Sequence, residues 1–96
     1  MSAPSPHERL QTRFRLSRGY RLQWEAAQDA HVLLFPEGMV KLNGSAAQIL
    51  LRCDGQAPLR DVVADLERQF DQPDLTHDVC QFVEFAQSRG WLEATS

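Results

Sequence analysis

The chain has 96 residues, of which 43% are hydrophobic and 24% are charged, and its formal net charge is −3. This length provides one hydrophobic core and excludes a second domain. No apolar run approaches the roughly 20 residues that a membrane-spanning helix requires, and the polar first residues lack the apolar segment of a signal peptide. We therefore expect a cytoplasmic protein that does not interact with membranes.

Charge is unevenly distributed along the chain. Residues 1–21 contain five arginines and a single acid, Glu8, whereas the remainder contains five basic and twelve acidic residues. Residues 1–17 also contain two prolines and show little apolar periodicity beyond Phe14–Leu16. This composition is typical of a solvated terminus, and also of a segment that binds an anionic partner. We interpret residues 1–17 as a flexible basic N-terminal arm and residues 18–96 as a single domain.

Three strands are predicted next. Apolar and polar residues alternate in Tyr20–Trp24, which is typical of a half-buried strand. His31–Phe35 is apolar enough to be a central strand, and Pro36–Gly38 has the composition of a tight turn. Met39–Leu42 follows as the third strand. Strands joined by such short connections form an antiparallel meander.

Three helices follow the strands. The first begins at Asn43 or Ser45, both good N-caps, and ends at Gly55, which tolerates the left-handed conformation. The second runs from Pro58 to Phe70, and the third from Leu75 to Ser88. The second helix carries one continuous apolar face, formed by Leu59, Val62, Val63, Leu66 and Phe70.

The order of these elements indicates an α+β fold, in which a three-stranded antiparallel sheet is followed by three helices. A sheet with one apolar face must be covered, and we expect the three helices to cover it. Trp91 and Leu92 are expected to return to the core after the third helix.

The residues that usually carry chemistry are widely separated. Histidines and cysteines do not occur at the spacings of metal ligands, and the glycines stand singly rather than in a phosphate-binding loop. Cys53 and Cys80 fall on apolar helix faces and are expected to be buried thiols. Ser45 is better explained as a helix cap than as a nucleophile. We predict no catalytic residue, no metal and no cofactor, and therefore no enzyme.

Nucleic-acid binding is one of two functions that stay open. Two short helices beside a small sheet can be arranged as a winged helix-turn-helix. A helix that reads DNA needs basic side chains near the phosphates. The third helix instead carries Asp74, Asp78 and Glu84, against Arg89 at its far end.

Peptide binding is the other function. The third strand is expected at a sheet edge, where unpaired backbone groups accept an added strand. We predict that this edge consists of Met39, Val40, Lys41 and Leu42. The third helix is expected to supply an apolar wall beside the edge, formed by Val79, Phe82, Val83, Phe85 and Ala86, with one set of these residues facing the core and the other partly exposed.

Three segments at these separations resemble the PqqD family of pyrroloquinoline quinone biosynthesis. The segments are Leu34–Asn43, Ala46–Leu50 and Cys53–Gly55, and the similarity extends from about Tyr20 to Leu92. The resemblance implies a winged-helix-like fold and a non-enzymatic peptide chaperone. Such a chaperone binds the precursor peptide PqqA and presents it to the radical S-adenosylmethionine enzyme PqqE, whose iron–sulfur clusters belong to that enzyme.

The resemblance also implies that the peptide adds as a strand in a cleft beside the third helix, which is the strand edge and helix wall named above. We expect a monomer or a weak homodimer. The alternative is a winged-helix nucleic-acid-binding protein.

Overall fold

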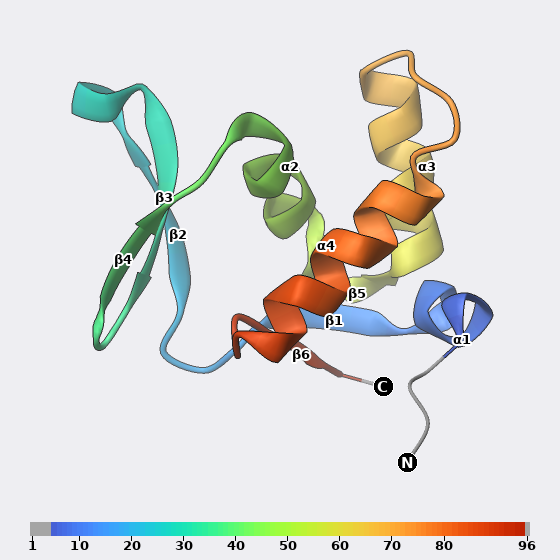
Figure 1. Cartoon of the computed structure of the whole chain (residues 1–96), viewed down its shortest axis with the longest axis horizontal. Coiled ribbons are helices and arrows are strands. Elements are labelled where there is room, and N and C mark those ends of the chain that lie inside the picture. The colour runs from blue at the N-terminus through green and yellow to red at the C-terminus, as the bar shows by residue number, and fades with distance from the viewer. Residues whose placement is uncertain (1–4, 96) are drawn as a thin grey trace.

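The computed structural model describes residues 5–95 as an α+β domain (Figure 1). Its elements in chain order are α1 (Pro6–Gln11), β1 (Arg13–Leu16), β2 (Arg21–Glu25), the 3-10 turn η1 (Ala26–Gln28), β3 (Ala30–Phe35), β4 (Gly38–Lys41), α2 (Gly44–Arg52), β5 (Asp54–Pro58), α3 (Leu59–Gln69), α4 (Thr76–Ser88) and β6 (Leu92–Ala94).

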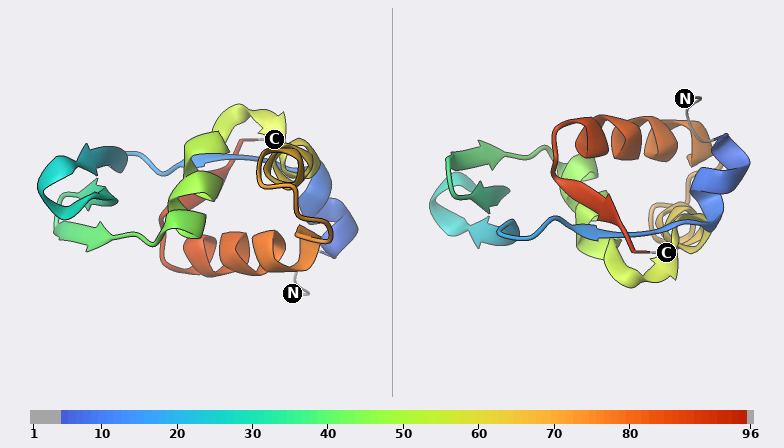
Figure 2. Two further views of the ribbon diagram at one scale, coloured as in Figure 1. Left: turned by 90° about the horizontal axis from the view of Figure 1, so that it is seen from above. Right: turned by 90° about the horizontal axis from the view of Figure 1, so that it is seen from below.

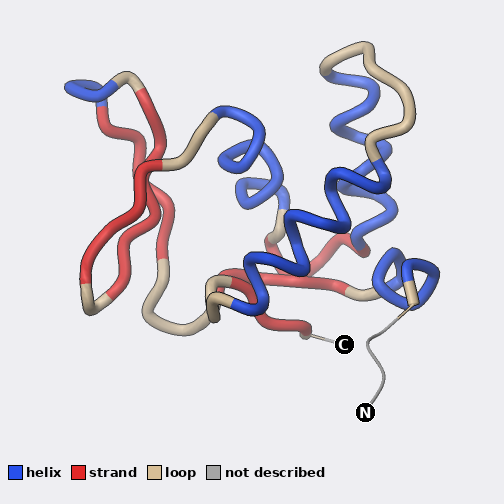
Figure 3. Tube along the Cα trace, in the orientation of Figure 1, coloured by secondary structure: helices blue, strands red, loops and turns tan. Residues whose placement is uncertain are grey.

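The strands form two antiparallel three-stranded sheets (Figure 3). The first has the order β2-β3-β4 and is the predicted meander, with Leu33 paired to both Leu22 and Val40. The second has the order β5-β1-β6 and was not predicted. The α+β class and the three helices after the meander are confirmed, whereas the winged-helix-like arrangement stays a prediction.

The N-terminal segment is part of the folded domain, so the prediction of a flexible arm over residues 1–17 is wrong for residues 5–17. Ser5 caps α1 by accepting a hydrogen bond from the N–H of Glu8 at 3.2 Å. Arg9 on this helix is buried and lies 3.7 Å from the carboxylate of Glu84 on α4. Strand β1 is the centre of the second sheet and buries Phe14. Residues 1–4 of the predicted arm lie outside the described residues.

Strand β5 occupies the segment that was expected to connect two helices. Its sequence, Asp-Gly-Gln-Ala-Pro, contains no β-branched or aromatic residue, which explains why no strand pattern was visible. The strand forms because β1 offers it a partner, with Arg13 opposite Pro58 and Arg15 opposite Asp54. Gly55 has φ of +81°, in agreement with its predicted left-handed conformation, but it lies in β5 and does not end α2, whose C-cap is Cys53.

The three predicted helices agree with the structure to within two or three residues at each end. Asn43, rather than Ser45, is the N-cap of α2, and its side chain accepts a hydrogen bond from the N–H of Ala46 at 2.8 Å. The side chain of Glu67 on α3 accepts a hydrogen bond from the N–H of Leu75 at 3.0 Å, immediately before α4 begins.

We expected the three helices to cover the first sheet, and this expectation is wrong. Helices α3 and α4 pack against each other and against β5 and β6, whereas α2 makes the main helical contact with the first sheet, through β3. The sheet β2-β3-β4 therefore projects from the helical body (Figure 1). Helices α3 and α4 bury their apolar faces against the second sheet instead. One side of the first sheet is therefore not covered by helices.

Among the described residues, no helix combines the length and the apolar character needed to cross a membrane.

Candidate functional site

Strand β4 has a free edge. Within residues 5–95 it pairs with no strand other than β3. The N–H of Leu42 donates to the carbonyl of His31 at 3.0 Å, which fixes the alternation of the ladder. Because backbone groups of successive residues in an antiparallel strand face opposite ways, Val40 faces β3, while Met39 and Lys41 direct their N–H and C=O groups outward.

The side chains of the predicted edge residues divide between two faces. Leu42 is buried in the core and Val40 is partly buried against it, whereas Met39 and Lys41 are exposed. The four residues therefore play different parts. Val40 and Leu42 anchor the strand to the body, and Met39 and Lys41 offer backbone donors and acceptors to a partner.

A groove of about 1050 Å³ opens where β4 ends. It is bounded by the first turns of α2, the end of α3 and one side of α4. Its lining residues are Asn43, Gly44, Ser45, Ala46, Gln48, Ile49, Leu66, Phe70, Gln72, Leu75, Asp78, Val79, Gln81, Phe82 and Phe85. Asp78 is the single charged residue among these, so the groove suits apolar and neutral polar groups.

The groove begins in the chain just after the edge strand ends. Residues 43–49 of the lining follow β4 directly. Figure 2 shows β4 and α4 along the same side of the molecule, while β2 lies on the opposite side. Of the two free edges of the first sheet, β4 is thus the one beside the groove.

The structure places part of the predicted wall on α4 in the lining of the groove, and its role in peptide binding stays a prediction. Phe82 and Phe85 line the groove, with Phe85 exposed, and Val79 contributes to its base although it is largely buried. Val83 and Ala86 are completely buried in the core and do not line the groove. The predicted division of the helix into a core face and an exposed face is therefore confirmed.

Two aromatic residues at the site were not predicted there. Trp91 packs edge-on against Phe85, with ring centroids 5.5 Å apart, and holds that side chain at the end of α4. Phe70 was expected on the buried face of α3, but it is the C-cap of that helix and is half-exposed in the groove. The position of Phe70 in the sequence continues the spacing of the buried face of α3. Its ring lies outside the core because the helix ends before it.

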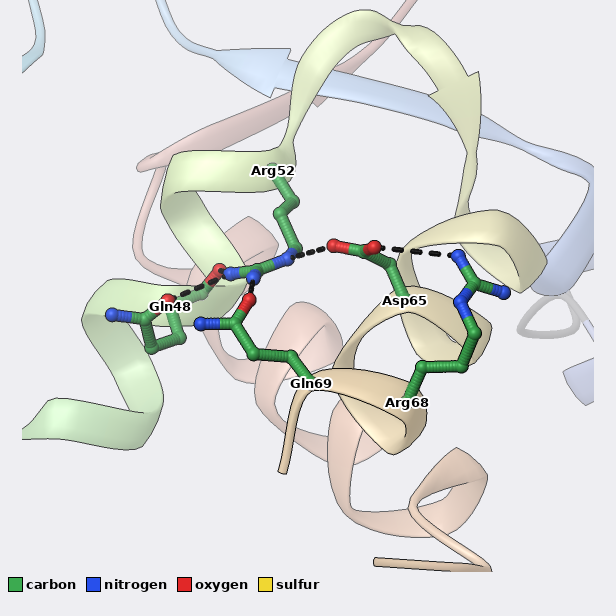
Figure 4. Close-up of polar contacts among 5 residues, drawn as sticks. All are labelled: Gln48, Arg52, Asp65, Arg68 and Gln69. Atoms are coloured by element: carbon green, nitrogen blue, oxygen red, sulfur yellow. Dashed lines mark hydrogen bonds and ion pairs between the residues drawn. The ribbon is translucent and has the colours of Figure 1, made fainter. Parts of the chain in front are cut away.

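Arg52 connects α2 to α3 through polar contacts (Figure 4). Its Nε donates to the carboxylate of Asp65 at 2.5 Å, and its Nη1 donates to the Gln48 side chain at 2.7 Å and the Gln48 carbonyl at 2.9 Å. A further hydrogen bond joins Arg52 to Gln69. The hydrogen bond from Arg52 lowers the pKa of Asp65 below its usual range.

Replacing Arg52 with alanine is expected to lower the melting temperature by roughly 5 °C, because this largely buried guanidinium joins two helices. The pKa of Asp65 is lower in the folded than in the unfolded state. The contact with Arg52 therefore stabilises the fold above the unfolded-state pKa, and this stabilisation is lost as pH falls through the folded-state pKa. The difference from wild type should therefore shrink below about pH 4. Arg60→Ala is the matched control, since Arg60 forms only an exposed ion pair at 3.9 Å. Equal melting temperatures of Arg52→Ala and wild type would contradict this assignment.

Both cysteines are buried free thiols, as predicted. Burial, and then the neighbouring Asp54 carboxylate, raises the pKa of Cys53 to about 12, and burial raises the pKa of Cys80. Within residues 5–95, no three or more His, Cys, Asp or Glu side chains are grouped as metal ligands. The thiols are thus packing groups.

We expect neither thiol to react quickly with a disulfide reagent at pH 8 in the folded protein, because the reactive species is the thiolate. Both should react once denaturant is added. Absorbance of the released chromophore measures this, and a rapid reaction of one equivalent without denaturant would contradict it.

A small α+β domain with an open strand edge beside an apolar groove belongs to the class of folds suited to binding by strand addition. The chain belongs to the PqqD family. The family model described as coenzyme PQQ synthesis protein D matches residues 30–92, so the resemblance noted in the sequence is confirmed.

Curated relatives support this assignment. A PqqA binding protein of Azotobacter vinelandii is 52% identical over 79 residues, which cover 81% of this chain and 86% of that protein. A PqqA binding protein of Acinetobacter baylyi is 46% identical over 77 residues, covering 79% and 78% of the two chains.

A solved structure is similar over nearly the whole chain. It is the solution NMR structure of the PqqD truncation of Methylobacterium extorquens PqqCD, with a TM-score of 0.69, 28% identity and 95% of each chain covered. That protein is described as a functional, stand-alone recognition element for ribosomally synthesized and post-translationally modified peptides.

Proposed function

We propose that the protein is a non-enzymatic chaperone that binds the precursor peptide PqqA as a strand added to β4. It then presents the bound peptide to the radical S-adenosylmethionine enzyme PqqE in pyrroloquinoline quinone biosynthesis. The observation that carries this proposal is the free β4 edge together with the largely apolar groove whose lining begins just after β4 in the chain. The names of the curated relatives and the recognition element of Methylobacterium extorquens support it.

The energetics require both parts of the site. Met39 and Lys41 offer two outward N–H and two outward C=O groups, and four hydrogen bonds contribute roughly 4 kcal/mol. Micromolar affinity corresponds to about 8 kcal/mol, and ordering a flexible peptide costs about 2 to 5 kcal/mol. Apolar side chains buried in the groove contribute about 1.5 to 3 kcal/mol each. The backbone therefore selects an extended segment, and the groove supplies most of the affinity.

Strand addition suits presentation to an enzyme. An added strand places alternate side chains on opposite faces, and only the face toward the groove is covered. The other face, and the peptide on either side of the strand, stay accessible. Acting as a carrier, the protein holds the peptide by groups that the enzyme does not need to modify.

Fluorescence anisotropy with a labelled synthetic PqqA peptide tests the proposal, with a labelled DNA duplex as the comparison. We expect saturable micromolar or tighter binding of PqqA with weak dependence on salt, and no specific binding of DNA. Indifference to PqqA together with steeply salt-dependent binding of DNA would contradict the proposal. A second assay, the rate at which PqqE modifies PqqA, should increase when this protein is added.

A further inference from the structure

The groove extends beyond the part that an added strand would cover. Its far end is formed by Leu66 on α3, by Phe70 at the C-cap of that helix, by Gln72 in the following loop, and by Leu75 just before α4. We call these four residues the far compartment. In Figures 1 and 2 the loop between α3 and α4 lies at the opposite end of the molecule from β4. A peptide side chain in this compartment would therefore belong to a residue outside the strand-forming segment.

The far compartment contains an exposed aromatic ring, and hydrogen bonds fix the backbone that carries it. Phe70 is 49% exposed although it directly follows a helix face that is otherwise buried. Its backbone is fixed by a hydrogen bond from its N–H to the carbonyl of Leu66 at 3.0 Å. The next turn is fixed by Glu67, whose carbonyl accepts from the N–H of Gln72 at 3.0 Å and whose carboxylate accepts from the N–H of Leu75 at 3.0 Å.

Contact of an apolar ring with water is unfavourable, so burial of the ring against an apolar ligand stabilises the complex. Leu75 is partly buried and supplies apolar surface in the same groove, the largely buried Leu66 lies at its base, and Gln72 adds a neutral polar side chain to the lining. The arrangement is that of an anchor pocket, in which mainly apolar walls carry a few polar groups.

The direction of β4 decides which part of a bound peptide reaches this pocket. Strand β4 runs from the hairpin at Gly38 toward Lys41 and then into α2, so the groove lies beyond its C-terminal end. Antiparallel pairing is the commoner and slightly more stable arrangement. A strand added antiparallel to β4 has its N-terminal end beside Lys41, and the residues before that end continue into the groove.

We propose that PqqA is held at a second position, where an apolar side chain N-terminal to its strand-forming segment occupies the far compartment against Phe70. This inference rests on the proposed function and deepens it. It predicts that the recognised part of the precursor has two elements, an extended segment and a separate apolar anchor that precedes it in sequence.

The test combines one substitution in the protein with shortening of the peptide. Phe70→Ala is expected to weaken binding of full-length PqqA about tenfold, whereas Phe70→Leu should retain most of the affinity. Leu51→Ala is the matched control, because Leu51 is 46% exposed on α2 but does not line the groove, and it should bind within about twofold of wild type. Thermal melts of all variants check that the fold is unchanged.

A nested series of N-terminally shortened PqqA peptides then identifies the occupant. Removal of the anchor residue should weaken binding to the wild type about tenfold and have no further effect on Phe70→Ala, since both changes remove the same contact. C-terminally shortened peptides should lose equal affinity for both proteins.

The outcomes separate this inference from the proposed function. If wild type does not bind PqqA at all, both fail. If PqqA binds and Phe70→Ala binds as tightly as wild type, the far compartment is not occupied and only this inference is overturned. If the loss in Phe70→Ala couples to C-terminal rather than N-terminal shortening, the assigned direction and anchor are wrong.

Discussion

Replacing Lys41 with proline is expected to weaken the binding of PqqA at least about 100-fold while leaving the fold intact. The N–H of Lys41 faces away from β3, so proline removes a donor that the folded protein itself does not use. An edge strand tolerates proline on its outward side, whereas the ring obstructs a strand that pairs with that side. Loss of about 3 kcal/mol corresponds to the stated change in affinity.

Val40→Pro is the matched control, because the N–H of Val40 faces Leu33 in the ladder. That variant should melt at a lower temperature than wild type, which Lys41→Pro should not. Isothermal titration of both proteins with PqqA, after circular dichroism has established their stability, measures the two effects. Wild-type affinity in a folded Lys41→Pro variant would exclude the β4 edge as the binding site.

Replacing Phe14 with alanine is expected to lower the free energy of unfolding by about 3 to 4 kcal/mol, a large part of the stability of a domain of this size. Phe14 is buried at the centre of the second sheet, where the strand that carries it pairs with both β5 and β6. A cavity at this position removes contacts from the core cluster to which Phe14 belongs.

Phe85→Ala serves as the control for the same chemical change at an exposed position, and it should cost about 1 kcal/mol or less. Urea denaturation followed by fluorescence measures both variants. If Phe14→Ala lowers the free energy of unfolding by less than about 1 kcal/mol, the N-terminal segment does not contribute to the core. That result would support the flexible arm predicted from the sequence.

Local patterns in the sequence were sufficient for the elements that carry their own signals. Alternation identified the meander, and the caps and apolar spacing identified α2, α3 and α4. The second sheet was missed because its strands have weak patterns individually. Phe14–Leu16 was visible as a short alternating segment, but only its pairing with Asp54–Pro58 and Leu92–Ala94 makes it a central strand. That pairing is a long-range property that no local window contains.

The candidate site was predicted in outline and not in detail. The free edge and the aromatic residues of α4 were identified, but the direction of each backbone amide depends on the register, which one hydrogen bond from Leu42 to His31 establishes. Phe70 was placed in the core because its spacing fits the buried face, and the end of α3 determines otherwise. The contribution of α2 to the groove was missed because the helices were expected on the first sheet.

Hydrogen exchange of backbone amides, measured by NMR with and without PqqA, tests strand addition to β4 most directly. The same alternation that directs Met39 and Lys41 outward on β4 directs Leu22 and Trp24 outward on β2, the opposite edge of the sheet. We expect PqqA to slow the exchange of the Met39 and Lys41 amides and to leave those of Leu22 and Trp24 unchanged. Unchanged exchange at Met39 and Lys41 in the saturated complex, or protection at the β2 edge instead, would show that the peptide does not add to β4.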